Sequence, residues 1–276
     1  MAAKRIEKLT QKIQLEPNNV NLYFKRANSY LSKGDYVKAT EDYTMAIHLE
    51  PNNSDYYFHR GMVYYSEDDF SKAIKDFTQL IHLEPNKSIY YFYRSEMYLK
   101  NKEYNKAIEE FTQLIHLEPN NITYYLYRGD AYLEYKNYDK AIDDFTQIID
   151  LGHYDDKFYN LRGDAYFLKG DNDKALEDYT TAKLGKLLNF TNSEKKVFYT
   201  GKIHLCKKDY GKAIEDFTKA IQSKKNRCWY NYWRGKAYCG KGEHNKARAD
   251  YEAVLLHNTD NFWTSLARKE LENLEK

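Results

Sequence analysis

The chain repeats one pattern of apolar and polar residues every 34 positions. In the second copy a glycine lies between two tyrosines, and an alanine, an aromatic residue and a proline follow: Tyr57, Gly61, Tyr64, Ala73, Phe77 and Pro85. Similar residue types return 34 positions earlier and 34 positions later. Because apolar residues spaced by three and four lie on one face of an α-helix, each copy predicts two amphipathic helices around a short turn. The proline ends the second helix, since it cannot continue the backbone hydrogen bonding.

Seven full copies of the pattern account for most of the chain. We expect them to begin at Val20, Ser54, Ser88, Ile122, Asp156, Glu194 and Cys228. Residues 1–19 predict an N-terminal half repeat, because a helical segment there ends in the same Leu-Glu-Pro-Asn motif as the full repeats. Residues 260–276 predict a capping helix with one apolar and one polar face, as the end of a stacked array requires.

The period is interrupted once, after the fifth copy. Residues 183–193 replace the usual repeat ending and add four residues, so repeats 1–5 occupy residues 20–193 and repeats 6 and 7 occupy residues 194–259. The apolar residues of this loop are Leu187, Leu188 and Phe190. Three interpretations are open: the loop covers a neighbouring core, forms a docking knob, or acts as a hinge between two blocks of repeats.

A helix–turn–helix unit of 34 residues with this pattern resembles the tetratricopeptide repeat family. The resemblance covers nearly the whole chain. It implies an all-α fold, in which residues 1–276 form a single right-handed solenoid. It also implies a function, because the first helices of successive repeats in this family line a concave groove that commonly binds extended or helical peptides. We therefore expect a non-catalytic scaffold or adaptor for a protein or peptide ligand.

Composition narrows the compartment and the class of partner. The 276 residues include 43 Lys+Arg and 41 Asp+Glu, so the net charge of +2 favours neither a nucleic acid nor a membrane surface. Three cysteines without a C-x-x-C pair favour reduced thiols in an intracellular protein. The first residues lack an apolar signal segment, and no apolar run has the length of a membrane span. We expect a cytoplasmic monomer without a cofactor.

Two recurring sets of polar residues are predicted to be structural. An arginine at the seventh position and an acid at the twenty-third lie at the same height on facing helices, so we expect an ion pair within each repeat. The alternative is a ladder of arginines for phosphate groups. Thr200 replaces the arginine in repeat 6, so Asp216 lacks an arginine partner.

The repeated histidines are His48, His82 and His116. Packed helices lie about 8–10 Å apart, too far for three such residues to bind one metal ion.

Specificity is expected on the face of the first helices that intra-repeat packing leaves free. The second, fifth, ninth and twelfth repeat positions share this face, and the candidates are taken from the fifth and ninth. The candidate peptide-binding residues are Phe24, Asn28, Phe58, Met62, Phe92, Glu96, Leu126, Asp130, Asn160, Asp164, Phe198, Lys202, Tyr232 and Lys236. The mostly aromatic fifth position would anchor apolar side chains. Alternatively, these rings pack against the next repeat. The ninth position changes from neutral through acidic to basic and would select charge, unless it is only a solvated polar face.

Charge is segregated along the chain. Residues 41–180 carry 15 Lys+Arg and 27 Asp+Glu, whereas residues 181–250 carry 17 and 6. A partner with complementary segments would be oriented by this field. An alternative function is binding of nucleic acid or another polyanion through the basic C-terminal third, although acids within that third argue against it. Self-association through the capping helix or the 183–193 loop is a further alternative.

Two other functions are not expected. Some family members hold the C-terminal carboxylate of heat-shock chaperones with a lysine at the fifth position and an asparagine at the ninth. No repeat here has that lysine, so binding of chaperone tails is not expected. The sequence contains neither a phosphate-binding loop nor an apparent catalytic triad, so enzymatic activity is not expected.

Overall fold

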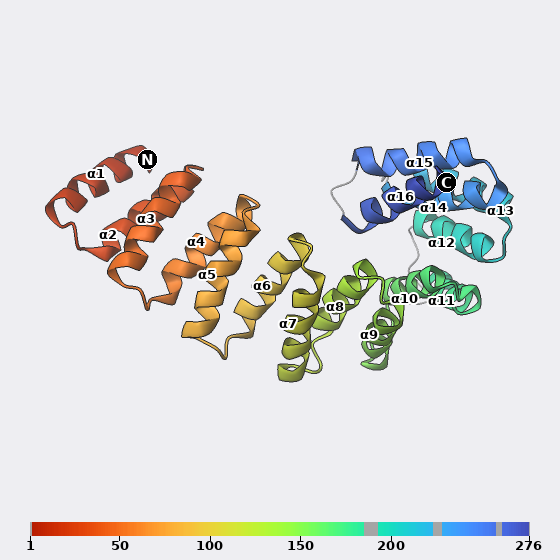
Figure 1. Ribbon diagram of the computed structural model, residues 1–276, viewed down its shortest axis with the longest axis horizontal. Helices are drawn as coiled ribbons and strands as arrows, with labels where there is room; N and C mark the ends of the chain where they lie inside the picture. Colours follow the sequence, from red (N-terminus) through yellow and green to blue (C-terminus); the bar gives the residue numbers. More distant parts are fainter. Residues whose placement is uncertain (1, 185–192, 223–227, 258–260, 276) are drawn as a thin grey trace. The chain divides into compact units, whose positions relative to one another are not determined.

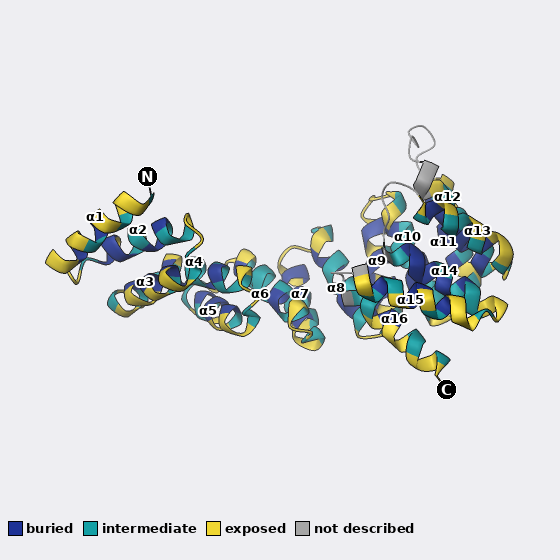
Figure 2. Cartoon of the chain, turned by 90° about the horizontal axis from the view of Figure 1, so that it is seen from above, coloured by how far each residue is buried: buried dark blue, intermediate teal, exposed yellow. Residues whose placement is uncertain are grey.

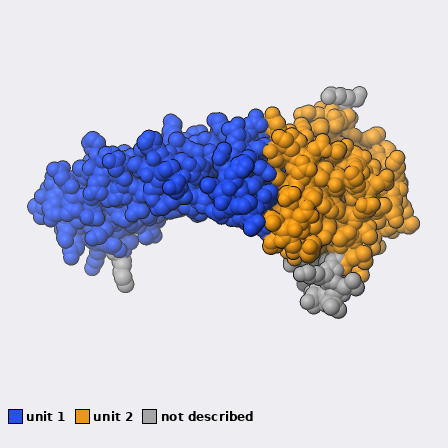
Figure 3. Space-filling view, turned by 90° about the horizontal axis from the view of Figure 1, so that it is seen from below, with its two compact units in different colours: residues 1–131 blue, residues 132–276 orange. Residues whose placement is uncertain are grey.

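The structure is a computed structural model that describes residues 2–184, 193–222, 228–257 and 261–275. Within these ranges it consists of sixteen α-helices and contains no strand (Figure 1), which confirms the predicted all-α class. The chain divides into two compact units, unit 1 with residues 1–131 and unit 2 with residues 132–276 (Figure 3). The expectation that repeats 1–7 form one continuous domain stays a prediction.

Unit 1 contains the half repeat, the first three full repeats and most of the first helix of the fourth. Its helices are α1 Ala2–Leu15, α2 Val20–Leu31, α3 Tyr36–Leu49, α4 Ser54–Ser66, α5 Phe70–Leu83, α6 Ser88–Lys100, α7 Tyr104–Leu117 and the greater part of α8 Ile122–Glu134. Each full repeat contributes a first and a second helix, as the pattern predicts. In α3, α5 and α7 buried and exposed residues alternate along the helix, whereas α4, α6 and α8 are buried or half-buried except near their ends (Figure 2).

Unit 2 contains the remaining repeats and the final helix. Its helices are α9 Tyr138–Asp150, α10 Asp156–Lys169, α11 Asn172–Leu184, α12 Ser193–Cys206, α13 Tyr210–Ile221, α14 Cys228–Lys241, α15 His244–His257 and α16 Asn261–Leu274. The last of these is the predicted capping helix. Most of the irregular loop, including Leu187, Leu188 and Phe190, lies outside the described residues, so its three interpretations stay open.

The turn inside each repeat has the same backbone conformation at its fifteenth residue. That residue has a positive φ in all seven repeats, at Gly34, Asp68, Lys102, Lys136, Gly170, Lys208 and Gly242. An aspartate or asparagine often follows and caps the second helix, because its side chain accepts a hydrogen bond from a backbone N–H of the first turn. Asp69 accepts from the Lys72 amide at 3.2 Å, and Asn137 accepts from the Lys140 amide at 3.3 Å.

The two helices of a repeat approach closely where the eighth residue is small. At Gly61 an added Cβ would lie 2.9 Å from Cε2 of Phe77, the ring at position 24 of the same repeat, and at Gly235 it would lie 2.6 Å from Cε1 of Tyr251. The small size of the eighth residue therefore has a direct cause. The ring of the second helix lies against the backbone of the first.

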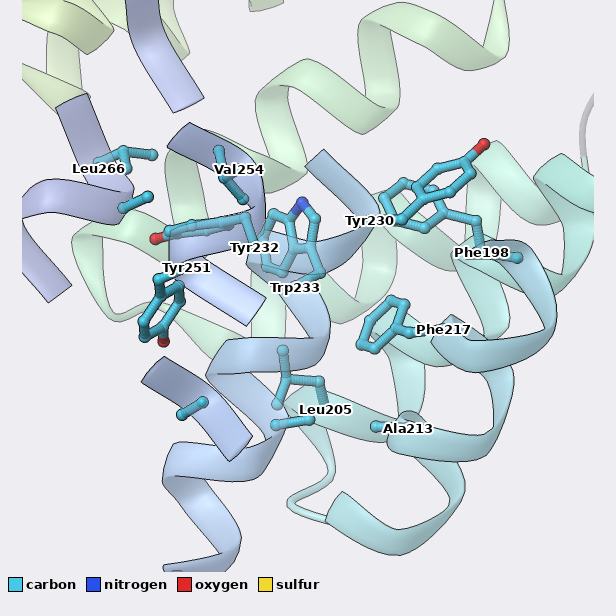
Figure 4. Packing of buried hydrophobic residues seen from close by; sticks show 14 of the residues in the cluster. Phe198, Leu205, Ala213, Phe217, Tyr230, Tyr232, Trp233, Tyr251, Val254 and Leu266 are labelled. Atoms are coloured by element: carbon cyan, nitrogen blue, oxygen red, sulfur yellow. The ribbon is translucent and has the colours of Figure 1, made fainter. Parts of the chain in front are cut away.

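The core of unit 2 centres on a tryptophan of repeat 7. The Trp233 side chain is fully buried between Tyr232, Tyr230 and residues of the neighbouring helices (Figure 4). Its ring lies 5.0 Å from that of Phe167 on α10 and 6.0 Å from that of Trp263 on α16. First helices of repeats 5 and 7 and the capping helix thus share one core.

Candidate interaction face

In repeats 1, 2, 3, 5 and 7 the arginine at position seven pairs with the acid at position 23. Two nitrogens of Arg26 donate to the two carboxylate oxygens of Asp42 at 2.7 and 2.8 Å. The other two-bond pairs are Arg60–Asp76, Arg162–Asp178 and Arg234–Asp250, and Arg94 makes one bond to Glu110. The predicted structural pair is confirmed in these repeats. These guanidinium groups already bind carboxylates, which disfavours a phosphate ladder.

The remaining guanidinium nitrogen links consecutive repeats. Arg26 Nη1 donates to the Thr10 hydroxyl on α1 at 3.0 Å, and Arg60 Nη1 donates to the Thr44 hydroxyl on α3 at 2.9 Å. A threonine lies 16 residues before each of the six arginines. The threonine therefore recurs with the same period as the arginine, and this spacing is the signal in the sequence that indicates the contact.

Repeat 6 replaces the arginine pair with a histidine pair. Thr200 stands at the arginine position, as the sequence shows, but Asp216 still has a partner. Nδ1 of His204, one turn further along α12, lies 2.9 Å from Oδ2 of Asp216. The acid at position 23 therefore still binds a side chain of the first helix, but that side chain lies four residues after the usual arginine position.

We use the term first-helix face for the side of α2, α4, α6 and α8 that carries repeat positions five and nine. In unit 1 its fifth-position rings are half-buried and pack toward the next repeat. Phe24 lies 5.3 Å from the Tyr56 ring, and Phe92 lies 5.4 Å from the Tyr127 ring. Phe58 lies 6.0 Å from the Tyr93 ring. These rings therefore pack against the next repeat, as the alternative interpretation of the fifth position states, although part of each ring remains accessible.

The other candidates in unit 1 also stay partly accessible. Met62, Glu96, Leu126 and Asp130 are half-buried. Asn28 is half-buried as well, and its side-chain oxygen accepts a 2.6 Å hydrogen bond from the Tyr43 hydroxyl. The structure thus leaves all eight candidates of unit 1 at least partly open to solvent.

Unit 2 differs, and four of its six candidates require a correction. Asp164, Phe198, Lys202 and Tyr232 are buried at 5% exposure or less. They were expected to face a ligand, but rings of neighbouring repeats cover them. Asn160 and Lys236 are half-buried. The Asn160 oxygen accepts from Lys202 at 2.8 Å, and Lys236 pairs with Glu270 of α16 at 3.1 Å.

Lys202 occupies a cage of aromatic rings inside unit 2. Its ammonium group donates to Oδ1 of Asp164, which also accepts a 2.8 Å hydrogen bond from the Tyr179 hydroxyl. Nζ lies 4.3 Å from the ring centre of Trp233, within the range of a cation–π interaction. Burial lowers the pKa of Lys202 and raises the pKa of Asp164, while their mutual attraction opposes both shifts. The opposite charges at position nine neutralise each other instead of selecting a partner.

Two tyrosines that are not among the candidate residues act on Glu96 in unit 1. The Tyr127 hydroxyl lies in hydrogen-bonding range of its carboxylate, and Tyr65 lies close enough for that charge to raise the Tyr65 pKa, after the larger effect of burial. Tyr65 is at position twelve, which was predicted to lie on the first-helix face, whereas position six of Tyr127 was not. Both positions are mostly aromatic or apolar along the chain, a pattern that resembles core packing.

The repeated histidines lie on the surface of unit 1. His48, His82 and His116 are exposed at the ends of α3, α5 and α7. Across the described part of the chain, no three His, Cys, Asp or Glu side chains come together as a metal ion would need. Nor does any helix there have the length and apolar character to cross a bilayer.

These observations define an all-α protein of stacked helical hairpins with a structural arginine–acid pair in most repeats. Family models described as tetratricopeptide repeat match residues 20–53, 54–87, 88–121 and 126–185, more than half of the chain. The chain belongs to the tetratricopeptide repeat family, as its 34-residue pattern indicated. A search of curated proteins found no match.

Solved structures show the same fold at low sequence identity. A tetratricopeptide repeat protein from Parabacteroides merdae is 16% identical with a TM-score of 0.73, over 93% of this chain and 99% of that one. Part of a repeat protein from Cytophaga hutchinsonii is 18% identical with a TM-score of 0.58, over 88% and 98%. YrrB, described as having an unusual peptide-binding site, is 19% identical with a TM-score of 0.52, over 64% and 91%.

Proposed function

We propose that this protein is a non-catalytic interaction scaffold that binds a peptide or protein segment on the first-helix face of unit 1. The fold supports the general role, because a stack of helical hairpins presents a long row of first helices to a partner. One observation carries the choice of unit. The candidate residues of unit 1 remain half-buried and accessible, whereas those of unit 2 are largely buried in its own core.

The accessible face combines apolar anchors with negative charge. Phe58, Met62 and Phe92 offer apolar surface on α4 and α6, and Glu96 and Asp130 follow at position nine of the next two repeats. Half-exposed apolar side chains beside polar ones are typical of interaction surfaces. A segment with apolar and basic side chains would complement this face, because its basic groups would meet the acids and its apolar groups would meet the apolar side chains.

The test is selection of ligands from a phage-displayed library of random twelve-residue peptides on the immobilised protein. Enriched peptides would be synthesised with a fluorescent label and titrated by polarisation. Met62→Ala removes an apolar anchor without changing the charge of the face and is expected to weaken binding about tenfold. Met45→Ala is the matched control, because Met45 is 39% exposed on the second helix α3. Circular dichroism would verify that both variants keep their helical content.

Two results would contradict the proposal. One is the absence of any enriched peptide. The other is a set of peptides whose affinity falls equally in Met62→Ala and Met45→Ala, because binding would then not depend on the first-helix face.

A further inference from the structure

Glu96 makes no ion pair with a basic side chain among the described residues. Lys100 lies one turn further along α6 and acts on the carboxylate only as a nearby charge. Glu110, the acid at position 23 of the same repeat, is instead bound by Arg94. Burial raises the pKa of Glu96, while the Tyr127 hydroxyl and the charge of Lys100 oppose that shift, so the carboxylate is partly withdrawn from water. A partly desolvated charge that lacks an ion pair is costly, and a bound cation would relieve that cost.

Aromatic groups surround this carboxylate from both neighbouring repeats. Tyr127 on α8 is held firmly, because its ring stacks on Phe111 at 5.6 Å with an interplanar angle of 17°. Tyr65 approaches from α4. Burial and the charge of Glu96 both raise the pKa of the Tyr127 hydroxyl, so the phenol stays protonated and its oxygen remains an acceptor, while Phe111 stacks on one face of the ring. An acid flanked by tyrosine rings is the environment that a basic side chain prefers.

In unit 2 the acid at the same repeat position binds a cation, although its tyrosine comes from a different place: Tyr179 is at position 24 of the repeat, where repeat 3 has Phe111. Asp164 occupies position nine of repeat 5, as Glu96 does in repeat 3. It accepts a hydrogen bond from the Tyr179 hydroxyl and binds the ammonium group of Lys202, which lies against the rings of Trp233 and Phe198. At repeat 5 the chain supplies its own cation from the next repeat. At repeat 3 the corresponding residue of the next repeat is Asp130, an acid.

We infer that Glu96, with the rings of Tyr65 and Tyr127, forms a subsite for a lysine or arginine side chain of a bound peptide segment. This inference rests on the proposed function and names the chemistry of the ligand at one point of the face. The guanidinium or ammonium group donates to the Glu96 carboxylate, and its alkyl stem and charge lie against the tyrosine rings. Asp130, one repeat further, adds negative potential at the same site.

The peptide selection described above tests this subsite when it is repeated on two further variants. Glu96→Gln removes the charge but keeps the size of the side chain. Glu109→Gln removes one charge from an exposed residue of the second helix α7 and is therefore the control for net charge. We expect lysine or arginine to be enriched at one position of the peptides selected on the unmodified protein and on Glu109→Gln. On Glu96→Gln the enrichment is expected to disappear.

A selected peptide would then be resynthesised with citrulline in place of arginine, or norleucine in place of lysine. We expect a loss of affinity of about tenfold or more on the unmodified protein and a much smaller loss on Glu96→Gln. Peptides that need Met62 but show no basic position, or that bind equally after neutral replacement, would overturn the subsite and leave the proposed function standing. Peptides that do not depend on Met62 would overturn both.

Discussion

One methylene group separates the arginine pair of repeat 3 from those of the other repeats. Four of the five described pairs use aspartate and form two hydrogen bonds, but Glu110 accepts only from Nη2 of Arg94. Nε of Arg94 and Oε2 of Glu110 are left buried without a partner. Such an atom costs about 1–3 kcal/mol, because it loses its water without gaining a hydrogen bond. Repeat 3 therefore has a less favourable pair than its neighbours.

We predict that Glu110→Asp stabilises repeat 3 by about 1 kcal/mol, because the shorter side chain restores the two-bond geometry. The reverse change, Asp76→Glu, is expected to destabilise repeat 2 by a similar amount. Amide hydrogen exchange measures both effects locally. Peptides from α6 and α7 report on the first variant, and peptides from α4 and α5 report on the second. Faster exchange in α6 and α7 after Glu110→Asp would show that the glutamate pair is the better one.

The buried pair of Asp164 and Lys202 also affects stability through single residues. Removing one partner leaves an uncompensated charge in the interior, which costs about 3–5 kcal/mol, whereas removing both charges costs less. Lys202→Met is therefore expected to lower the stability of unit 2 strongly, and the double variant with Asp164→Asn to recover a large part. Urea unfolding followed by tryptophan fluorescence measures this, because all three tryptophans lie in unit 2: Trp229, Trp233 and Trp263. A double variant less stable than Lys202→Met would refute the paired-charge explanation.

At the scale of elements, the turn between the two helices of a repeat carries a conformational cost in four repeats. Its fifteenth residue has φ between 57° and 62° at Asp68, Lys102, Lys136 and Lys208, where three other repeats have glycine. The left-handed region costs a residue with a Cβ about 1–2 kcal/mol, and glycine avoids this cost. The helix propensity of lysine gives no benefit there, because the residue lies outside both helices.

Lys102→Gly is therefore expected to stabilise unit 1, by up to about 1 kcal/mol after the greater entropy of glycine in the unfolded chain is included. Lys75→Gly makes the same substitution at an exposed position inside α5 and is expected to destabilise by about 1 kcal/mol. Thermal unfolding followed by circular dichroism compares the two. If both variants lose stability equally, the positive φ at residue 102 has no measurable cost.

At the scale of the whole molecule, the basic section of the sequence carries less free charge than its composition indicates. Lys202 and Lys236 bind Asp164 and Glu270, two acids from outside residues 181–250 that the section's own count leaves out. Three further pairs lie within the section, where both charges are already counted: Lys212–Asp209, Arg234–Asp250 and Lys246–Glu243. Local neutralisation weakens the field that a polyanion would meet. Binding of nucleic acid through residues 181–250 stays a prediction, and these pairs disfavour it.

A fluorescein-labelled single-stranded RNA of random sequence tests this alternative. At an ionic strength of about 0.15 M we expect only weak, salt-sensitive binding, with a dissociation constant of about 10⁻⁴ M or higher. Fluorescence polarisation over a series of salt concentrations measures both the affinity and its salt dependence. Submicromolar binding at that ionic strength would favour the polyanion function over the scaffold function.

The sequence by itself determined the helices, their order and the pairs within a repeat. These features depend on residues within one hairpin, so a period of 34 residues places Arg26 opposite Asp42 without knowledge of the rest of the chain. The resemblance to the family also predicts that a partner binds on the first helices, and this stays a prediction. The threonine partners of the arginines were equally periodic, and a closer reading of the same pattern would have found them.

Only the tertiary structure decided which of these residues remain accessible. Lys202 and Glu96 both occupy the ninth position, yet one is enclosed by Asp164 and Trp233 and the other is half-open between tyrosines. Repeat position specifies the side of a helix on which a residue lies. The depth of its burial depends on the size of side chains in neighbouring repeats, which come from distant parts of the chain. Accessibility is therefore a property of the packed repeats and not of the period.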